Sequence, residues 1–328
     1  MASTMKAFVV DKNEDVFERK IVSVPLPKPH EGETLVRVVW SSINYKDCLA
    51  SIPNGKVIRN YPRIPGIDFA GIVEKSTSSK FLVGTPVFSN GNTLGVTSDG
   101  GFAEYCVVPN EYLMPLPDSL DLSKTMIAGT AGFTAAQSVL ELLENGVVPD
   151  RGPILVTGAT GGVGSFAVAL LASLGFEVVA STGRRNRADW LRQIGAQEVI
   201  DRLPNQTKSL ESEQWSAVLD TVGGTSLAAA LASVKYSGVV TACGNTGGVE
   251  LQTTVFPFIL RGIKLVGIDS VNCPMDAKIK VWTWLGQTLN AKYWDFLVGK
   301  TVHLNDLPDA LDEVLSGSAH GRTIVSIG

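Results

Sequence analysis

The chain has 328 residues, of which 45% are hydrophobic and 18% are charged, and its formal net charge at pH 7 is -4. Chains of this length usually exceed what one hydrophobic core supports, so we expect two domains. The acidic balance gives no electrostatic reason to expect nucleic acid or an anionic membrane as a partner. It therefore favours small-molecule ligands.

The N-terminal stretch has no basic segment followed by an apolar segment, so it does not resemble a signal peptide. No apolar run approaches the ~20 residues that a membrane-spanning helix needs, and we expect a cytoplasmic protein without a membrane partner. The four cysteines, Cys48, Cys106, Cys243 and Cys273, are far apart and form no C-x-x-C pair. They predict neither a disulfide framework nor a zinc ribbon.

Short β-like runs, separated by clusters of Gly, Pro, Asn and Ser, fill the chain from residue 5 to about residue 117. This pattern is typical of a β-barrel or β-sandwich. The runs are KAFVV (6–10), TLVRVVW (34–40), FAGIVEKS (69–76) and FAEYCVV (102–108).

Strand and helix patterns alternate in the next part of the chain, which predicts an α/β fold with a doubly wound parallel sheet. The final stretch, 304–328, indicates a helix and a last strand, but its pattern assigns it to neither domain. The strand candidates are PILVTG (153–158), EVVASTG (177–183), EVIDR (198–202), SAVLDTV (216–222), GVVTACG (238–244) and KLVGIDS (264–270).

The stretch GATGGVG (158–164) lies between a predicted strand and a predicted helix, in which apolar residues recur at helical spacing over 163–174. A strand, a glycine turn and a helix N-terminus together present backbone N–H groups and the positive end of the helix dipole to an anion. Gly161, Gly162 and Gly164 permit a tight turn and a close approach to phosphate. The six-strand context favours a dinucleotide site over a simple turn.

The end of the second strand indicates which dinucleotide binds. An NAD-binding fold places Asp or Glu there, about 20 residues after the glycine turn, to hold the ribose hydroxyls. This chain has STGRRNR (181–187) instead, so hydroxyl groups and a guanidinium are available for an additional ribose phosphate. The alternative is that these arginines start a solvated helix, where their charge would oppose the helix dipole. The sequence therefore predicts NADPH as the cofactor.

Two reductase families share a glycine turn of this kind. Short-chain dehydrogenases also need a Tyr-x-x-x-Lys pair, and none of the six tyrosines here has Lys four residues later.

A β-rich part followed by a Rossmann part, with GIDFAGIV (66–73) and GGFAEY (100–105), resembles the medium-chain dehydrogenase/reductase superfamily across essentially the whole chain. Its zinc-dependent alcohol dehydrogenases have Cys where this chain has Asn44, and Gly-His-Glu where it has Gly66, Ile67 and Asp68. The four-cysteine lobe is also absent, so we expect no metal.

Further stretches are similar to the zinc-independent YhdH/YhfP group, whose members carry quinone oxidoreductase names and include acrylyl-CoA reductases. The resemblance implies a GroES-like catalytic domain at 1–124 and 294–328, a Rossmann NADPH-binding domain at 125–293, and a homodimer. The matching stretches are SSINYKD (41–47), RNYPRIPGIDFAG (59–71), GTAGFTA (129–135), FPFILRGIKLVGIDSVNCP (256–274) and GRTIV (321–325).

The same resemblance implies an activity. NADPH would lie in the cleft between the domains and give a hydride to the β-carbon of an activated double bond, without metal. A short enoyl-CoA such as acrylyl-CoA is the expected substrate, and Lys56, Arg59, Arg63 and Arg261 are candidates to meet CoA phosphates. One alternative is an NADPH:quinone or enone-detoxifying oxidoreductase. A second is an NADPH-binding protein with little catalysis.

The expected catalytic residues are Tyr45, Asn44 and Asp68. By resemblance, Tyr45 orients the nicotinamide or substrate and donates a proton, Asn44 and Asp47 place it, and Asp68 either assists proton delivery or pairs with Lys46. The expected cofactor contacts, also by resemblance, are Tyr45, Thr130, Thr160, Gly161, Gly162, Val163, Ser181, Thr182, Gly183, Arg184, Asn245, Phe258, Ile268, Ser270 and Arg322. A helix N-cap would equally explain Thr130, and a surface position would explain Arg322.

Overall fold

The computed structural model describes residues 3–13, 16–204 and 208–328. The chain divides into two compact units. The first unit comprises Met1–Thr130, Val271–Thr283 and Val298–Gly328, and the second comprises Ala131–Ser270 and Trp284–Leu297. The domain limits expected from the resemblance stay a prediction.

The first unit is built on a seven-stranded sheet in the order β14-β15-β3-β4-β5-β7, with β6 paired to β3. All neighbours in it are antiparallel except β14 and β15. A separate antiparallel pair is formed by β1 and β2. The strands are β1 (Thr4–Asn13), β2 (Val16–Pro25), β3 (Glu33–Ser42), β4 (Asp68–Ser76), β5 (Pro86–Asn90), β6 (Tyr105–Pro109), β7 (Met114–Pro115), β14 (Val298–His303) and β15 (Arg322–Ser326).

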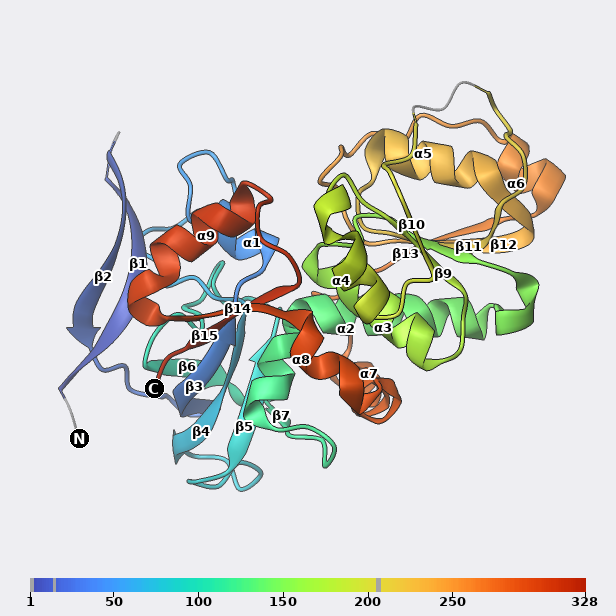
Figure 1. Ribbon diagram of the computed structural model, residues 1–328. Helices are drawn as coiled ribbons and strands as arrows, with labels where there is room; N and C mark the ends of the chain where they lie inside the picture. Colours follow the sequence, from blue (N-terminus) through green and yellow to red (C-terminus); the bar gives the residue numbers. More distant parts are fainter. Residues whose placement is uncertain (1–2, 14–15, 205–207) are drawn as a thin grey trace. The chain divides into compact units, whose positions relative to one another are not determined.

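Helix α9 (Leu307–Leu315) fixes the short helix α1 (Tyr45–Ala50) in this unit, and the two lie side by side in Figure 1. Leu307, Ala310 and Leu311 are buried at helical spacing along one face of α9. They share a hydrophobic cluster with Cys48 of α1. Packing of α9 therefore holds the helix that begins with Tyr45.

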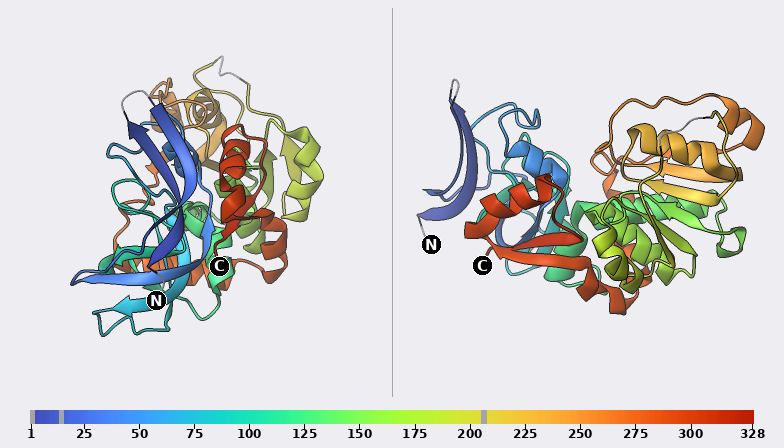
Figure 2. Two further views of the ribbon diagram at one scale, coloured as in Figure 1. Left: turned by 90° about the vertical axis from the view of Figure 1, so that its left-hand side faces the viewer. Right: turned by 45° about the horizontal axis from the view of Figure 1, so that its top comes forward.

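The second unit contains a six-stranded parallel sheet in the order β10-β9-β8-β11-β12-β13, the arrangement of a doubly wound fold. Figure 1 shows α5 on one face of this sheet and α3 on the other, and the right-hand view of Figure 2 agrees. The elements are β8 (Ile154–Val156), β9 (Val178–Ser181), β10 (Glu198–Ile200), β11 (Trp215–Asp220), β12 (Val234–Ala242), β13 (Lys264–Gly267), α3 (Gly162–Ser173), α4 (Ala188–Gln193), α5 (Gly224–Ser233), α6 (Phe256–Arg261) and α8 (Trp294–Leu297).

Two helices contain residues of both units: α2 (Leu122–Glu144) and α7 (Met275–Thr288). Gly129 interrupts α2 with φ 52° and ψ -157°. Contrary to the expectation from the sequence, α2 is long and apolar enough to cross a membrane by length and composition. However, 72% of its most apolar window is buried inside the structure, which is how a core helix is packed.

The fold class is confirmed. All six strands predicted for the doubly wound sheet are present, and the helix predicted after the glycine turn is α3. This helix is buried from Gly164 to Leu171, whereas the sequence predicted a single apolar face. The elements that were not predicted include strands β2, β5, β7 and β14 and helix α1.

Candidate functional site

Asp68, the first residue of β4, is the centre of a buried polar cluster in the first unit. Its carboxylate accepts hydrogen bonds from Ser42 Oγ at 2.9 Å and from Asn44 Nδ2 at 2.7 Å. Thr130 donates twice, from its backbone N at 2.7 Å and from Oγ1 at 2.5 Å. The break in α2 at Gly129 precedes Thr130 directly and frees its backbone N–H for this contact. Both carboxylate oxygens are therefore fixed by the chain itself.

Arg322, the first residue of β15, is 3% exposed and completes this cluster. Its Nε donates to the Ile127 carbonyl and its Nη1 to the Ile43 carbonyl, each at 3.0 Å. Its Nη2 donates to Ser42 Oγ at 2.9 Å and lies 4.0 Å from Asp68 Oδ2. Burial lowers the pKa of the guanidinium, and the nearby carboxylates oppose that effect.

Asp47 links α1 to the loop that precedes β4. Its carboxylate accepts hydrogen bonds from the backbone N of Asn44 at 2.8 Å, of Ile67 at 2.9 Å and of Gly66 at 3.2 Å. Burial, and then the charge of Asp68, raise the pKa of Asp47 to about 7. A buried acid thus fixes the first turn of α1 relative to β4.

Tyr45 follows Asn44 and begins α1, yet its side chain is 43% exposed. Within the described part of the chain, no hydrogen bond is formed by its hydroxyl. Asn44 beside it is 8% exposed, and its amide donates to Asp68 and accepts from Arg322 at 3.3 Å. A buried group of hydrogen-bonded side chains, which includes Asn44 and Asp68, therefore lies next to the exposed phenol side chain of Tyr45.

The residues at the zinc positions of the related alcohol dehydrogenases do not fit a zinc ion. Asn44 turns its amide nitrogen toward Asp68, and an amide N–H group has no lone pair to offer a metal. The Asp68 oxygens are already directed at N–H and O–H donors. In residues 3–13, 16–204 and 208–328, no group of three or more His, Cys, Asp or Glu side chains is placed to hold a metal ion.

The glycine turn in the second unit has the geometry that a pyrophosphate site needs. Gly161 is the N-cap of α3 and has no side-chain cap, so the first N–H groups of the helix keep no partner from a capping side chain. A Cβ on Gly164 would come within 2.7 Å of the Ala159 Cα, so only glycine lets α3 approach β8 this closely. Thr160 Oγ1 lies 3.1 Å from Thr182 Oγ1 and joins the turn to the end of β9.

The end of β9 is rich in arginine. Arg184 donates its backbone N to Thr182 Oγ1 at 3.1 Å, and burial, with the charges of Arg187 and Arg202, lowers the pKa of its guanidinium. Arg185 forms a two-pronged ion pair with Asp201, at 2.5 and 2.8 Å. Such a pair neutralises Arg185, which the sequence had offered as part of the same basic stretch.

The other residues expected near the nicotinamide follow neighbouring strands of the same sheet. Ile268 comes directly after β13 and donates its backbone N to the Ala242 carbonyl at the end of β12, at 3.0 Å. Asn245 is exposed in the loop after β12, and Ser270 follows Ile268 two residues on. Phe258 lies in α6 and packs against the hydrophobic core of the unit.

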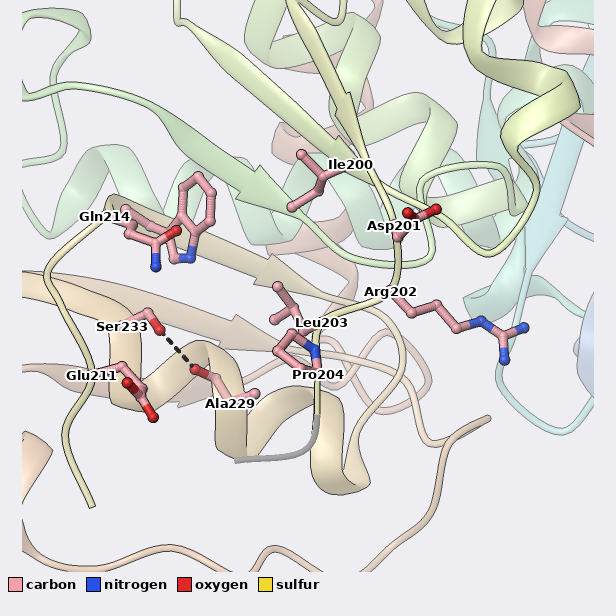
Figure 3. Close-up of a pocket in the computed structure, with 10 residues that line it drawn as sticks. Ile200, Asp201, Arg202, Leu203, Pro204, Glu211, Gln214, Ala229 and Ser233 are labelled. Carbon is pink, nitrogen blue, oxygen red and sulfur yellow. Dashed lines mark hydrogen bonds between the residues drawn. The ribbon is translucent and has the colours of Figure 1, made fainter. Parts of the chain in front are cut away.

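A cavity of about 460 Å³ lies beside the residues that follow β10 (Figure 3). Ile200, Leu203 and Pro204 form one wall, and Ala229 and Ser233 of α5 form another. None of the residues expected from the sequence lines it, and its lining shares no residue with the Asp68 cluster or with the glycine turn.

Four of the predicted residues, Asn44, Asp68, Thr130 and Arg322, meet in one hydrogen-bonded cluster. Thr160 and Thr182 meet in a second group around the glycine turn. Sequence reasoning missed Ser42, although it lies in the quoted stretch SSINYKD.

Two family models match the chain, the alcohol dehydrogenase GroES-like domain at residues 30–118 and the zinc-binding dehydrogenase at residues 162–286. YhfP of Bacillus subtilis, which carries a quinone oxidoreductase name, is 45% identical over all of both chains. The acrylyl-CoA reductase AcuI of Ruegeria pomeroyi is 41% identical over 98% of each chain.

Solved structures agree with these relatives. The crystal structure of YhfP with NAD bound has a TM-score of 0.96 and 43% identity, covering 99% of this chain and 100% of the other. The YhdH oxidoreductase of Salmonella enterica in complex with NADP has a TM-score of 0.95 and 39% identity, with the same coverage. The chain therefore belongs to the medium-chain dehydrogenase/reductase family, in the group that contains YhfP, YhdH and AcuI.

Proposed function

We propose that the protein is an NADPH-dependent reductase of activated carbon–carbon double bonds, and that its substrate is a short enoyl-CoA such as acrylyl-CoA. The observation that carries this proposal is the accessible Tyr45 hydroxyl beside a buried, fully hydrogen-bonded cluster at the positions where related enzymes hold zinc. The 41% identity to an acrylyl-CoA reductase over nearly the whole chain supports the substrate class.

The second unit fits NADPH. We propose that Thr160, Gly161, Gly162 and Val163 hold the pyrophosphate through backbone N–H groups at the start of α3. Ser181, Thr182, Gly183 and Arg184 would hold the adenosine phosphate end. Asn245, Phe258, Ile268 and Ser270, which follow or flank β12 and β13, would hold the nicotinamide half. A YhdH structure with NADP supports NADPH, whereas the YhfP structure contains NAD, so the preference needs a direct measurement.

When bound, NADPH supplies a hydride for the β-carbon of the substrate. The α-carbon then needs a proton, and Tyr45 would donate it. Its side chain is 43% exposed and its hydroxyl makes no hydrogen bond within the described chain, which supports this role. Asn44 and Asp68 would act by holding the first turn of α1. The products are the saturated acyl thioester and NADP⁺, with the tyrosine restored by a proton from solvent. No metal takes part in this scheme.

The role of Arg322 follows from its contacts. All its hydrogen bonds run to the chain, and its side chain is 3% exposed. We therefore propose that Arg322 positions the Asp68 cluster, rather than binding the cofactor as the sequence suggested. Thr130, which donates twice to Asp68, would have the same positioning role.

Two of the four cations considered for CoA phosphates are engaged elsewhere. Arg261 donates to three backbone carbonyl groups, and Arg63 pairs with Asp99 at 3.0 Å. Lys56 and Arg59 are exposed, in the loop that follows α1. These two are the better candidates for a phosphate of CoA.

The test follows NADPH absorbance with acrylyl-CoA, crotonyl-CoA and a benzoquinone in parallel, with NADH as the control cofactor. We expect kcat/KM for acrylyl-CoA to exceed that for the quinone by at least about ten-fold, equivalent to ~1.4 kcal/mol in the transition state. A preference for the quinone would favour the second candidate, which the name of YhfP supports. NADPH binding without turnover on any of them would favour a cofactor-binding protein.

We also propose a homodimer formed at the free edge of the parallel sheet. Strand β13 is the last strand of the sheet, and the adjacent helix α6 exposes apolar side chains. Phe256, Ile259 and Leu260 are 45%, 67% and 57% exposed, which is unusual for apolar residues so close together. We further propose that the protein is cytoplasmic and has no nucleic-acid or membrane partner. The proposed domains are a catalytic domain at 1–124 and 294–328 and an NADPH-binding domain at 125–293.

A further inference from the structure

We propose that Asp220 is a positioning residue that sets the spacing between the pyrophosphate half and the nicotinamide half of the cofactor site. This inference rests on the proposed function and assigns a role to a buried acid outside the Asp68 cluster. Asp220 is the last residue of β11, and its side chain is 0% exposed. It therefore acts through the loops that it holds rather than on a ligand.

The place of β11 in the sheet lets one residue reach two loops of the proposed site. Strand β11 lies between β8 and β12, and the carboxyl ends of parallel strands meet at the same edge of a sheet. The glycine turn follows β8 at this edge, and the loop 243–248, which contains Asn245, follows β12. A side chain at the end of β11 has one of these loops on each side.

Hydrogen bonds tie Asp220 to the start of the glycine turn. Its Oδ1 accepts from Thr157 Oγ1 at 2.7 Å. Thr157 Oγ1 in turn accepts from the backbone N of Thr221 at 3.0 Å, and Thr221 Oγ1 donates to the Thr157 carbonyl at 2.8 Å. A Cβ on Gly158 would collide with the Thr221 hydroxyl, so the turn lies directly against the residue after Asp220.

The same carboxylate shapes the turn that follows β11. Its Oδ2 accepts from the backbone N of Gly223 at 2.7 Å and of Val222 at 3.3 Å. The Val222 carbonyl then accepts from the backbone N of Gly247 at 2.7 Å, and the Asp220 carbonyl accepts from the backbone N of Cys243 at 3.0 Å. The turn that Asp220 holds is thus bonded to the loop after β12.

Close packing leaves these two loops no room to shift separately. Gly223 has φ 74°, and a Cβ on it would lie 2.7 Å from the Gly248 carbonyl oxygen and 2.9 Å from that of Gly244. A displacement of residues 222–223 would therefore move the loop 243–248 as well. Loss of the Asp220 carboxylate should change the position of Asn245 relative to the glycine turn.

The hydrogen bonds also indicate which replacement can restore the function. Burial raises the pKa of Asp220, whereas the bonds from Thr157, Gly223 and Val222 oppose that effect. Asparagine has nearly the same shape as aspartate. Its amide oxygen can accept from Gly223, and its amide nitrogen can donate to Thr157 Oγ1. Alanine can replace neither contact.

The test compares a whole cofactor with a fragment of it in wild type and in Asp220→Ala. Calorimetric titration gives Kd for NADPH and for adenosine 2′,5′-bisphosphate, which has no nicotinamide half. We expect Kd for NADPH to rise roughly ten-fold and Kd for the fragment to change less than about two-fold. The kcat at saturating NADPH should fall at least about ten-fold, because the nicotinamide is misplaced. A role in folding alone would not separate the two ligands.

Three further variants complete the experiment. Asp220→Asn should return both the NADPH affinity and kcat to within about three-fold of wild type. Gly247→Ala keeps Asp220 but places a Cβ 2.7 Å from Cγ1 of Val222, so we expect the same selective loss, roughly three-fold for NADPH. Asp150→Ala is the matched control and should change neither Kd, since Asp150 is exposed before β8, at the opposite edge of the sheet.

Each outcome decides the inference. Unchanged NADPH affinity in Asp220→Ala, an equal loss for NADPH and the fragment, or no recovery in Asp220→Asn would overturn it. If Asp220→Ala does not fold, Gly247→Ala decides in the same way. A wild-type protein that bound NADPH without turnover would refute the proposed reductase, while the two affinities would still test Asp220. A wild-type protein that did not bind NADPH would refute both.

Discussion

Replacement of Asp47 by Asn should remove a pH dependence of stability that the buried cluster creates. Burial and the neighbouring charge of Asp68 raise the pKa of Asp47 from an ordinary value of 3.8 to about 7 in the folded protein. Between these two values the unfolded chain has released the proton while the folded chain retains it. The free energy of unfolding therefore falls as pH rises, by about 1.4 kcal/mol per pH unit for this one group.

The size of the effect can be worked out for an accessible range. From pH 4.5 to pH 7 the wild-type protein should lose about 3 kcal/mol through Asp47, and above pH 8 the loss should level off. Asp47→Asn cannot titrate, but it loses acceptor capacity toward the backbone N–H groups of Asn44, Gly66 and Ile67, which should cost about 1–3 kcal/mol at low pH. The difference in stability between the two proteins should therefore narrow as pH rises.

Urea unfolding followed by tryptophan fluorescence at several pH values from 4.5 to 8.5 measures this difference. Asp220, whose pKa burial also raises, contributes equally to both proteins and cancels in the comparison. Asp312→Asn is a suitable control, because Arg19 lowers the pKa of Asp312 and places its titration below this range. A difference between wild type and Asp47→Asn that stayed constant with pH would refute the assignment of a raised pKa to Asp47.

Three further predictions concern the proposed roles. Tyr45→Phe should retain NADPH affinity and lower kcat at least about ten-fold, as measured by absorbance assays, while Tyr236→Phe, at a residue that is 66% exposed in the second unit, should leave kcat unchanged. Arg322→Lys should lower the free energy of unfolding by about 2–4 kcal/mol in urea titrations, because a single ammonium cannot reach the Ile127 and Ile43 carbonyl groups together with Ser42. Ile259→Asp should convert a dimer to a monomer in sedimentation experiments, and a wild-type monomer would contradict the proposed edge contact.

The parallel sheet was readable from the sequence because its strands are buried on both faces. Ala217, Val218 and Leu219 of β11 are each 0% exposed, and such strands give continuous apolar runs. Strand β2 was missed for the opposite reason. Its ten residues are all exposed or half-exposed, so the apolar pattern that marks a strand is weak. Helix α1, with six residues, is too short for a helical period to show.

Some candidate site residues could be named from their spacing in the sequence, and others could not. Arg184 could be named as a candidate from the sequence, because it follows the glycine turn at the spacing of one strand–helix–strand unit, and its role stays a prediction. The Asp68 cluster could not be worked out by spacing, since Arg322 and Asn44 are 278 residues apart and only the pairing of β15 with β3 brings them together. Resemblance to a family named these residues and predicted a cofactor contact for Arg322, to which we assign a positioning role by proposal instead.

The buried cluster holds the backbone next to Tyr45, although the side chain of Tyr45 is 43% exposed. A helix of six residues is marginal by itself, because few of its backbone groups find partners within it. Here Asp47 binds the N–H groups of Asn44, Gly66 and Ile67, and Asn44 in turn binds Asp68. These bonds fix the backbone on both sides of residue 45. The hydroxyl of Tyr45 has no hydrogen-bond partner in the described chain. Hydrogen bonds from the chain itself thus hold the backbone at the start of α1.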